Sequence, residues 1–262
     1  MRVLVINLDH QTERLAFQTQ QLTRLGLSMQ RLTAVTRDDP CVQASPEYWD
    51  SWQRPLSLSE RACLLSHRRA WEIILASGSP ALILEDDAVL APDTANLMHA
   101  LEAITDLDHV SLELRQRKKL LSRQSRPLYA EHVLRRLYLD RTGAAAYVLW
   151  PNGARKLLAL ADQHCGLADG LICECESLLS YQVEPAAAFQ LDQCRKLGLA
   201  PPVHTQSSIS LTQHERPSRH WRHRWRRLVA QLQMGWRQLY NWPRAQRRHV
   251  RVIADSFSLP QS

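Results

Sequence analysis

The sequence is poor in glycine and lacks the glycine-rich loops that bind phosphates. Only eight glycines occur among the 262 residues, and neither a GxxxxGK(S/T) nor a GxGxxG pattern is present. Such loops hold the phosphates of ATP and of dinucleotides on backbone N–H groups. The sequence therefore argues against ATPases and dinucleotide-dependent enzymes.

The six cysteines show no metal-binding spacing. No CxxC pair is present, and the pair Cys173 and Cys175 has no matching second half. Cysteine zinc sites normally need such pairs. We therefore expect reduced thiols and no structural zinc.

Long apolar runs are also missing. A membrane-spanning helix needs about 20 predominantly apolar residues, and no segment approaches that length. The opening MRVLVINLDH is typical of a short strand and not of a signal peptide. The sequence predicts a cytoplasmic protein.

Acidic residues are absent from the segment 216–251, which contains eleven arginines. The whole chain carries a net charge of +7, so the remainder carries −4. The basic character therefore belongs to the C-terminal segment, and we divide the chain into a main domain (1–212) and a basic helical tail (213–262).

The tail has an apolar stripe at helical spacing. Its members are Trp221, Trp225, Leu228, Leu232, Trp236 and Leu239. A basic helix with such a stripe is typical of peripheral binding to an anionic membrane, here the inner membrane. Two alternatives remain open: the stripe docks on the domain as core, or the arginines bind nucleic acid nonspecifically. No nucleic-acid-binding fold accompanies them, so we expect no specific nucleic-acid partner.

Three adjacent carboxylates lie inside the apolar segment ALILEDDAVL (81–90). Residues 81–84 predict a central parallel strand buried on both faces, and ligands bind at the carboxyl ends of such strands. Glu85 and Asp87 offer the hard oxygen ligands that suit Mg²⁺ or Mn²⁺ beside a nucleotide diphosphate. Alternatively, these acids cap a turn or begin a helix. Phosphatases and two-metal nucleases also place acids after apolar strands.

Local signals predict several other elements. A strand over residues 2–6 precedes a helix over 12–25, which favours an α/β domain. Ser57 and Glu60 form a capping box at the start of a second helix, whose inward face carries His67. Two interpretations of His67 remain open: it takes a direct part in the chemistry, or it is a core histidine whose hydrogen bonds are made within the protein. The basic segment 115–126 predicts a flexible loop.

Several segments, taken together, resemble the successive signatures of glycosyltransferase family 25, the bacterial lipooligosaccharide and collagen galactosyltransferase group. They are VINLDHQTER, LSLSERACLLSHRRAWEIIL, ALILEDDAVL, TGAAAYVLWPNGARKLL, GLADGLI and HTQSSI. The resemblance covers about residues 1 to 212. It implies an α/β, GT-A-like nucleotide-diphosphate-sugar fold with a central mixed sheet.

The resemblance also implies roles for individual residues. Asn7 and Asp9 would lie beside the donor nucleotide and Arg14 would help to hold it, and we add His67 to these candidate substrate-binding residues. Glu85 and Asp87 match the metal motif for Mn²⁺ or Mg²⁺. The catalytic base would be Asp169, or else Asp169 only caps a helix, and His204 would complete the metal shell.

These features lead us to expect a metal-dependent, inverting hexosyltransferase. It would move galactose, or glucose, from a UDP-sugar to a lipid-linked lipopolysaccharide or lipooligosaccharide core acceptor. The alternatives are a catalytically silent adaptor that uses the basic tail on membranes or nucleic acid, and a metal-dependent phosphatase.

Overall fold

The computed structural model describes residues 1–140, 142–203, 221–254 and 257. The strands are β1 (Arg2–Asn7), β2 (Met29–Thr33), β3 (Ala81–Glu85), β4 (Ala88–Leu90), β5 (His109–Ser111), β6 (Glu113–Leu114), β7 (Lys119–Ser122), β8 (Arg126–Tyr129), β9 (His132–Leu139), β10 (Ala146–Leu149), β11 (Ser180–Glu184), β12 (Ala188–Gln190) and β13 (Ala245–Arg248). The helices are α1 (Thr12–Arg24), α2 (Pro40–Gln43), α3 (Pro46–Trp49), α4 (Leu58–Ser77), α5 (Thr94–Glu102), α6 (Pro151–Gln163), α7 (Ala168–Glu174), α8 (Trp221–Asn241) and the 3₁₀ helix η1 (Leu191–Leu197).

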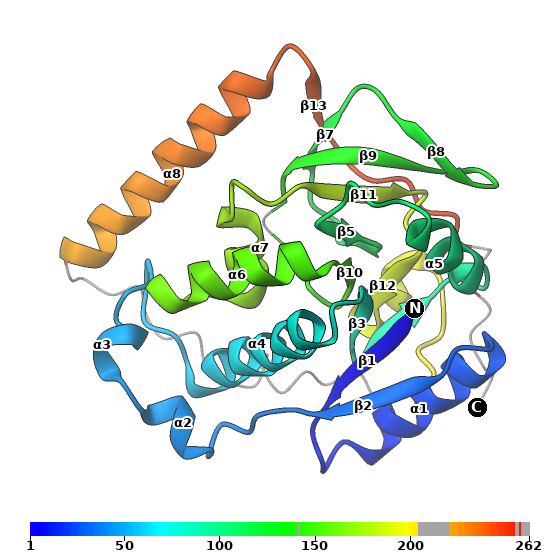
Figure 1. Ribbon diagram of the computed structural model, residues 1–262, viewed down its shortest axis with the longest axis horizontal. Helices are drawn as coiled ribbons and strands as arrows, with labels where there is room; N and C mark the ends of the chain where they lie inside the picture. The colour runs from blue at the N-terminus through cyan, green and yellow to red at the C-terminus, as the bar shows by residue number, and fades with distance from the viewer. Residues whose placement is uncertain (141, 204–220, 255–256, 258–262) are drawn as a thin grey trace.

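A large mixed sheet organises the molecule (Figure 1). Its strand order is β13-β7-β9-β11-β5-β10-β3-β1-β2, with β8 paired to β9. β1 runs parallel to both β2 and β3, whereas β10 runs antiparallel to β3 and β5. A smaller sheet has the order β4-β12-β6. The expected α/β architecture with a central mixed sheet is confirmed.

The central strands are buried on both faces. Val3 and Val5 of β1 belong to a core cluster that also contains residues of α1 and α5. Leu4 and Ile6 point the other way, into a cluster with residues of α4 and α6. Each fully buried side chain of this kind contributes about 1.5–3 kcal/mol. Helices on both sides therefore hold the carboxyl end of β1 and β3 in place.

The start and the end of α4 are set by local signals. Ser57 accepts a hydrogen bond from the Glu60 N–H, and the Glu60 side chain accepts one from the Ser57 N–H. Gly78 ends the helix at φ +63°, where a side chain would be strained. The capping box predicted from the sequence is confirmed, and α4 presents His67 to the sheet.

The basic segment 115–126 is not the flexible loop that its composition predicts. It contains β7, which pairs with β9 and β13. Lys119 is fully buried there, with its Nζ 2.5 Å from Asp140 Oδ2 and 2.6 Å from Gln182 Oε1. The prediction was wrong because the acceptors that neutralise and solvate Lys119 come from distant parts of the chain.

The segment after residue 212 contributes to the sheet as well as to a helix. β13 pairs with β7 at the edge of the large sheet, and Phe257 packs on Phe189 with ring centroids 4.7 Å apart. The last described residues thus belong to the packing of the main domain.

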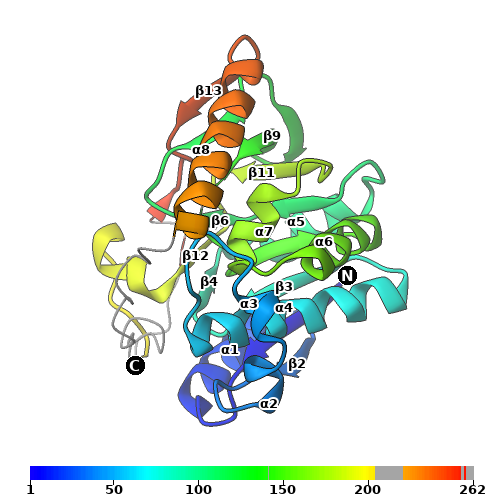
Figure 2. The same ribbon diagram turned by 90° about the vertical axis from the view of Figure 1, so that its left-hand side faces the viewer.

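α8 stands along one side of the molecule, beside β9 and α7 (Figures 1 and 2). Polar contacts join it to the body: His223 lies 3.0 Å from an Asp50 carboxylate oxygen, and Arg226 donates to the Asp50 carbonyl. The stripe residues predicted above are between 45% and 70% exposed. The alternative in which they dock as core is therefore wrong. Among the described residues, none of the helices combines the length and apolarity required for a transmembrane span.

Glu184 ties the C-terminal segment to the sheet and provides a test of stability. Its buried carboxylate accepts hydrogen bonds from Arg135, Arg248 and the Arg251 N–H. Burial alone would raise its pKa, but these donors lower the pKa of Glu184 to about 2 from 4.5.

A carboxylate whose pKa is lower in the folded than in the unfolded protein stabilises the folded protein at pH values above its unfolded pKa. This contribution, about 3 kcal/mol, is fully present above pH 4.5 and is lost as the pH falls toward 2. We expect Glu184→Gln to lower the free energy of unfolding at pH 7 by about that amount, measured by urea denaturation. The exposed Glu131→Gln is the control. An equal stability of the Glu184→Gln and control proteins would contradict this expectation.

Candidate functional site

The acidic residues follow β3 at its carboxyl end, and the middle one is already paired. Asp86 accepts a hydrogen bond from Asn7 at 2.8 Å and forms an ion pair with Arg14 at 3.0 Å. Asn7 ends β1 and Arg14 belongs to α1. The structure therefore brings two of the predicted substrate-binding residues onto Asp86, where they fix the turn after β3.

Glu85 is held by a chain of hydrogen bonds from α4. His67 Nε2 lies 3.2 Å from Glu85 Oε1, and Gln190 donates to Glu85 Oε2 at 2.9 Å. On the other side of the ring, His67 Nδ1 lies 2.9 Å from the Tyr147 hydroxyl, which accepts from Trp71 Nε1. Although burial opposes it, the hydrogen bond from His67 lowers the pKa of Glu85. His67 thus orients an ionised Glu85.

Asp87 has the opposite environment. Its Oδ1 is buried and has no hydrogen-bond partner among the described residues. Burial, followed by the negative charge of Glu85, raises the pKa of Asp87 to about 8. A buried carboxylate oxygen without a partner is costly, and a divalent cation would remove both the repulsion and the missing interaction. Glu85 and Asp87 therefore fit a hard cation such as Mn²⁺ or Mg²⁺.

Cys63, His67 and Glu85 form a second possible ligand group, with their ligand atoms within 4.8 Å of one another. The thiol is a poor ligand here, since burial and then the charges of Glu85, Asp169 and Asp87 raise the pKa of Cys63. A protonated thiol does not bind metal well. The carboxylates remain the better donors. His204, predicted to complete the shell, lies outside the described residues.

Glu113 is a buried acid of this region that the sequence analysis missed. Its Oε2 accepts from the Ala145 N–H at 2.9 Å, and its Oε1 lies 3.8 Å from Arg115 Nε. Burial raises the pKa of Glu113 to about 8. A Cβ on Gly143 would lie 2.6 Å from Oε2 of Glu113, so glycine is needed where the chain passes this carboxyl. The sequence feature that could have identified Glu113 is a single glutamate within the apolar run around residue 113.

Asp169 and Asp9 occupy different surroundings. Asp169 is in the first turn of α7, and burial raises its pKa, with the backbone N–H of Gly143 opposing that effect. The charge of Asp169, like those of Glu85 and Asp87, helps to raise the pKa of Cys63. Asp9 is exposed and pairs with Arg31 at 2.5 Å.

Comparison with known proteins decides the family. Residues 1–172 match the family described as "Glycosyltransferase family 25 (LPS biosynthesis protein)". The chain belongs to glycosyltransferase family 25. A family 25 member from Anopheles gambiae is 30% identical over 100 residues, which is 34% of this chain and 17% of that protein.

Two solved structures align with this chain at low similarity. One is a Drosophila beta-1,4-galactosyltransferase 7 mutant with manganese, UDP-Gal and xylobiose (10% identity, TM-score 0.39, 82% of this chain and 80% of that chain). The other is an inositol-1-phosphate CTP transferase from T. maritima (8% identity, TM-score 0.40, 72% of this chain and 89% of that chain).

After the residues that match family 25, α8 forms a wall of two cavities that share several lining residues, Asp169 among them. The first, of about 380 Å³, lies between α8, β9 and α7. The second, of about 440 Å³, lies between α8 and the segment around Trp52. Both are lined by Asp169, Cys173, Glu176 and Arg237. Glu85 and Asp87 line neither cavity, so the acidic pair and these cavities are separate parts of the structure.

Proposed function

We propose that this family 25 protein is a metal-dependent hexosyltransferase. It would transfer galactose from UDP-galactose to the saccharide part of a lipopolysaccharide or lipooligosaccharide core acceptor. The observation that supports this most is the half-buried pair Glu85 and Asp87 at the end of β3, in which Oδ1 of Asp87 is buried and has no hydrogen-bond partner among the described residues.

The acidic residues after β3 and their hydrogen-bond partners have separate roles in this proposal. Glu85 and Asp87 hold the cation, and His67 fixes the Glu85 carboxylate. When bound, Mn²⁺ or Mg²⁺ supplies positive charge opposite the departing nucleotide diphosphate. Asn7 and Arg14 keep Asp86, and with it the turn, in position.

Asp169 is the proposed base for an inverting displacement. The acceptor hydroxyl oxygen forms the new bond to the anomeric carbon while the bond to the diphosphate oxygen breaks. The hydroxyl proton passes to the Asp169 carboxylate. Burial raises the pKa of Asp169, which makes its carboxylate a stronger base than an exposed aspartate.

The experiment that tests this function is calorimetric titration of UDP-galactose, with UDP-glucose as the comparison, in the presence and absence of Mn²⁺. We expect binding that requires the cation and slow release of UDP in the absence of acceptor. A protein that binds neither nucleotide sugar would favour the adaptor alternative. Release of phosphate from simple esters without UDP would favour a phosphatase.

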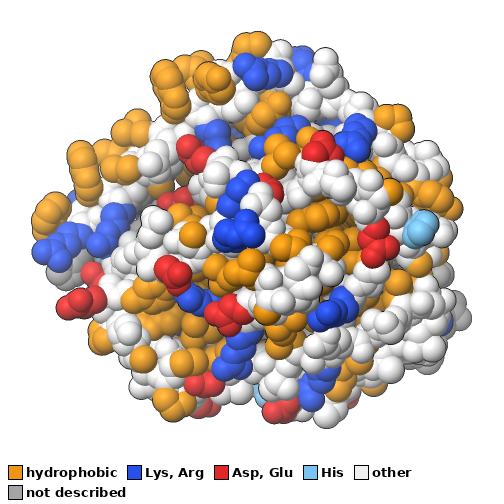
Figure 3. All heavy atoms as spheres, in the orientation of Figure 1, with side chains coloured by type: hydrophobic (Ala, Val, Ile, Leu, Met, Phe, Trp, Pro, Cys, Tyr) orange, Lys and Arg blue, Asp and Glu red, His pale blue; other side chains and the backbone are white. Residues whose placement is uncertain are grey.

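The exposed stripe of α8 supports peripheral attachment to an anionic membrane, the surface that carries a lipid-linked acceptor. In the space-filling view its apolar side chains project along the edge where α8 lies, next to arginines (Figure 3). Trp225 and Leu232 are 61% and 64% exposed. Burial of apolar groups in a lipid interface and attraction of arginine to anionic lipids act together.

We expect the double variant Trp225→Ser, Leu232→Ser to lose about 100-fold in vesicle affinity, since each side chain contributes about 1.5–3 kcal/mol when buried. The measurement is co-sedimentation with phosphatidylcholine vesicles containing phosphatidylglycerol. Gln231→Ser, exposed on the same helix, is the matched control. Equal sedimentation of both variants would refute attachment through the stripe.

A further inference from the structure

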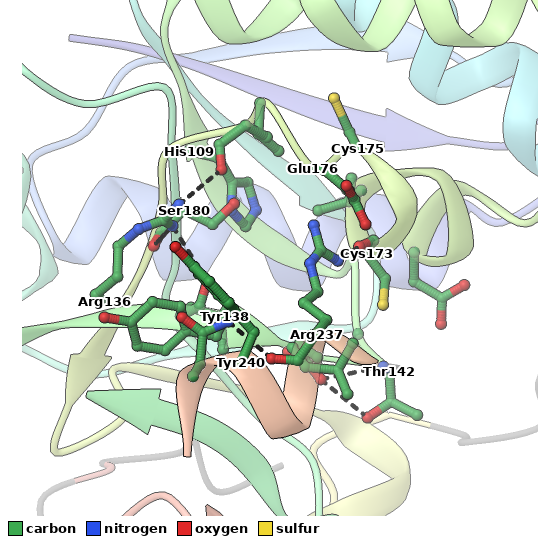
Figure 4. Close-up of a pocket in the computed structure, with 18 of the residues that line it drawn as sticks. His109, Arg136, Tyr138, Thr142, Cys173, Cys175, Glu176, Ser180, Arg237 and Tyr240 are labelled. Carbon is green, nitrogen blue, oxygen red and sulfur yellow. Dashed lines mark hydrogen bonds between the residues drawn. The ribbon is translucent and has the colours of Figure 1, made fainter. Parts of the chain in front are cut away.

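The cavity between α8, β9 and α7 contains groups that suit a saccharide. Tyr138 comes from β9, and Trp236 and Tyr240 come from α8. The close-up shows Tyr138 and Tyr240 next to each other at one end of the cavity, with Arg237 beside them (Figure 4). Aromatic faces stack on the apolar face of a sugar ring while polar groups bind its hydroxyls.

Two arginines of the cavity form no ion pair with a carboxylate of the described residues. Arg136 donates to the carbonyls of Ser180 and Leu178, and Arg237 donates to the carbonyl of Cys173. The ion pairs of arginine within the described ranges do not include Arg136 or Arg237. Together with the hydrogen bond from Arg136 to the Leu137 carbonyl, these bonds use only part of the five donors of each guanidinium, so donors remain for ligand oxygens.

The cavity also has the volume of a small-ligand site, and Asp169 is part of its lining. Its volume of about 380 Å³ lies within the range of small-ligand sites, about 300–1,000 Å³. Asp169, the proposed base, lies at its border with the second cavity. An acceptor hydroxyl that enters this cavity can therefore approach the group that takes its proton.

We propose that this cavity is the acceptor subsite, and that α8 supplies its outer wall through Trp236, Arg237 and Tyr240. The ligand class is a saccharide, bound by stacking on the tyrosines and by hydrogen bonds to the arginines. α8 lies after residues 1–172, the part of the chain that matches the family. This wall therefore gives the chain an acceptor specificity that the matched residues alone do not determine. Trp236 lines the cavity and is also part of the exposed stripe. The proposal rests on the transferase function proposed above.

The test is saturation-transfer NMR of lactose, cellobiose and maltose with the full chain in the presence of UDP and Mn²⁺. We expect at least one disaccharide to bind, and its signal to fall by about tenfold in Arg237→Gln and in Tyr240→Ala, as expected for the loss of a charge-assisted contact or a stacking contact. Arg224→Gln is the matched control, because Arg224 is exposed on α8 and lines neither cavity. Thermal unfolding of each variant shows whether the fold is kept.

The outcomes separate this inference from the proposed function. If UDP-galactose binds with Mn²⁺ but all three disaccharides fail to bind, or bind the two α8 variants as well as the unaltered protein, the acceptor subsite is elsewhere and only this inference is overturned. If neither UDP-galactose nor UDP-glucose binds at all, the transferase function fails and the subsite fails with it. Loss of disaccharide binding in Arg224→Gln as well would show that charge alone, and not the cavity wall, is responsible.

Discussion

Replacement of Asp87 by asparagine should reduce Mn²⁺-dependent transfer by about 1,000-fold, because a cation that stabilises the leaving diphosphate contributes several kcal/mol. The same change should leave the free energy of unfolding equal or raise it by about 1 kcal/mol, since burial and the charge of Glu85 already disfavour an ionised Asp87. Release of UDP in the presence of acceptor measures the first effect and urea denaturation the second, and calorimetry of UDP-galactose shows whether cation-dependent binding is lost.

The neighbouring Asp86→Asn provides the contrast. Asp86 is paired with Arg14 and Asn7, so its substitution removes an ion pair from the buried Arg14 guanidinium and should lower the free energy of unfolding by about 3–5 kcal/mol. Asp162→Asn, at the exposed end of α6, is the surface control. Cation-dependent binding that is unchanged in Asp87→Asn would exclude Asp87 as a ligand. A loss of stability equal to that of Asp86→Asn would contradict its assignment as an unpaired acid.

Replacement of Asp169 by asparagine should reduce turnover by about 10²–10⁴-fold, the usual contribution of a positioned general base. Affinity for UDP-galactose with Mn²⁺ should stay the same, because Asp169 contacts the acceptor side in the proposed arrangement. The measurement is UDP release with and without a bound disaccharide, together with calorimetry of the donor. Asp162→Asn is the reference variant. If Asp169→Asn turns over as fast as this reference, another residue accepts the proton.

Local sequence signals predicted the parts of the fold that depend on neighbouring residues. The capping box of Ser57 and Glu60, the strand over residues 81–84 and the helix 12–25 are of this kind, and the structure contains all three. The acids after β3 were also found, because carboxylates in an apolar run are rare and stand out.

The pairing of side chains distant in sequence was not predictable. Asn7 and Asp86 are 79 residues apart, and Tyr147 meets His67 across 80 residues. Which of three adjacent acids is neutralised, and which is left unpartnered, depends on these contacts alone. The burial of Lys119 in β7 has the same origin, since its acceptors lie just after β9 and on β11. The roles given to Asn7, Asp9, Arg14, His67 and Asp169 stay predictions until they are tested by substitution.

The attachment of α8 at its C-terminal end has a mechanical consequence. β13 follows the helix after a short turn and is hydrogen-bonded into the sheet, while His223 fixes the other end to Asp50. A helix of 21 residues is about 32 Å long, so a lipid surface that takes up the stripe would hold the whole domain at one height and one tilt. Under the proposed function, the fixed distance from that surface to Asp169 would then select acceptors by how far their terminal sugar lies from the membrane.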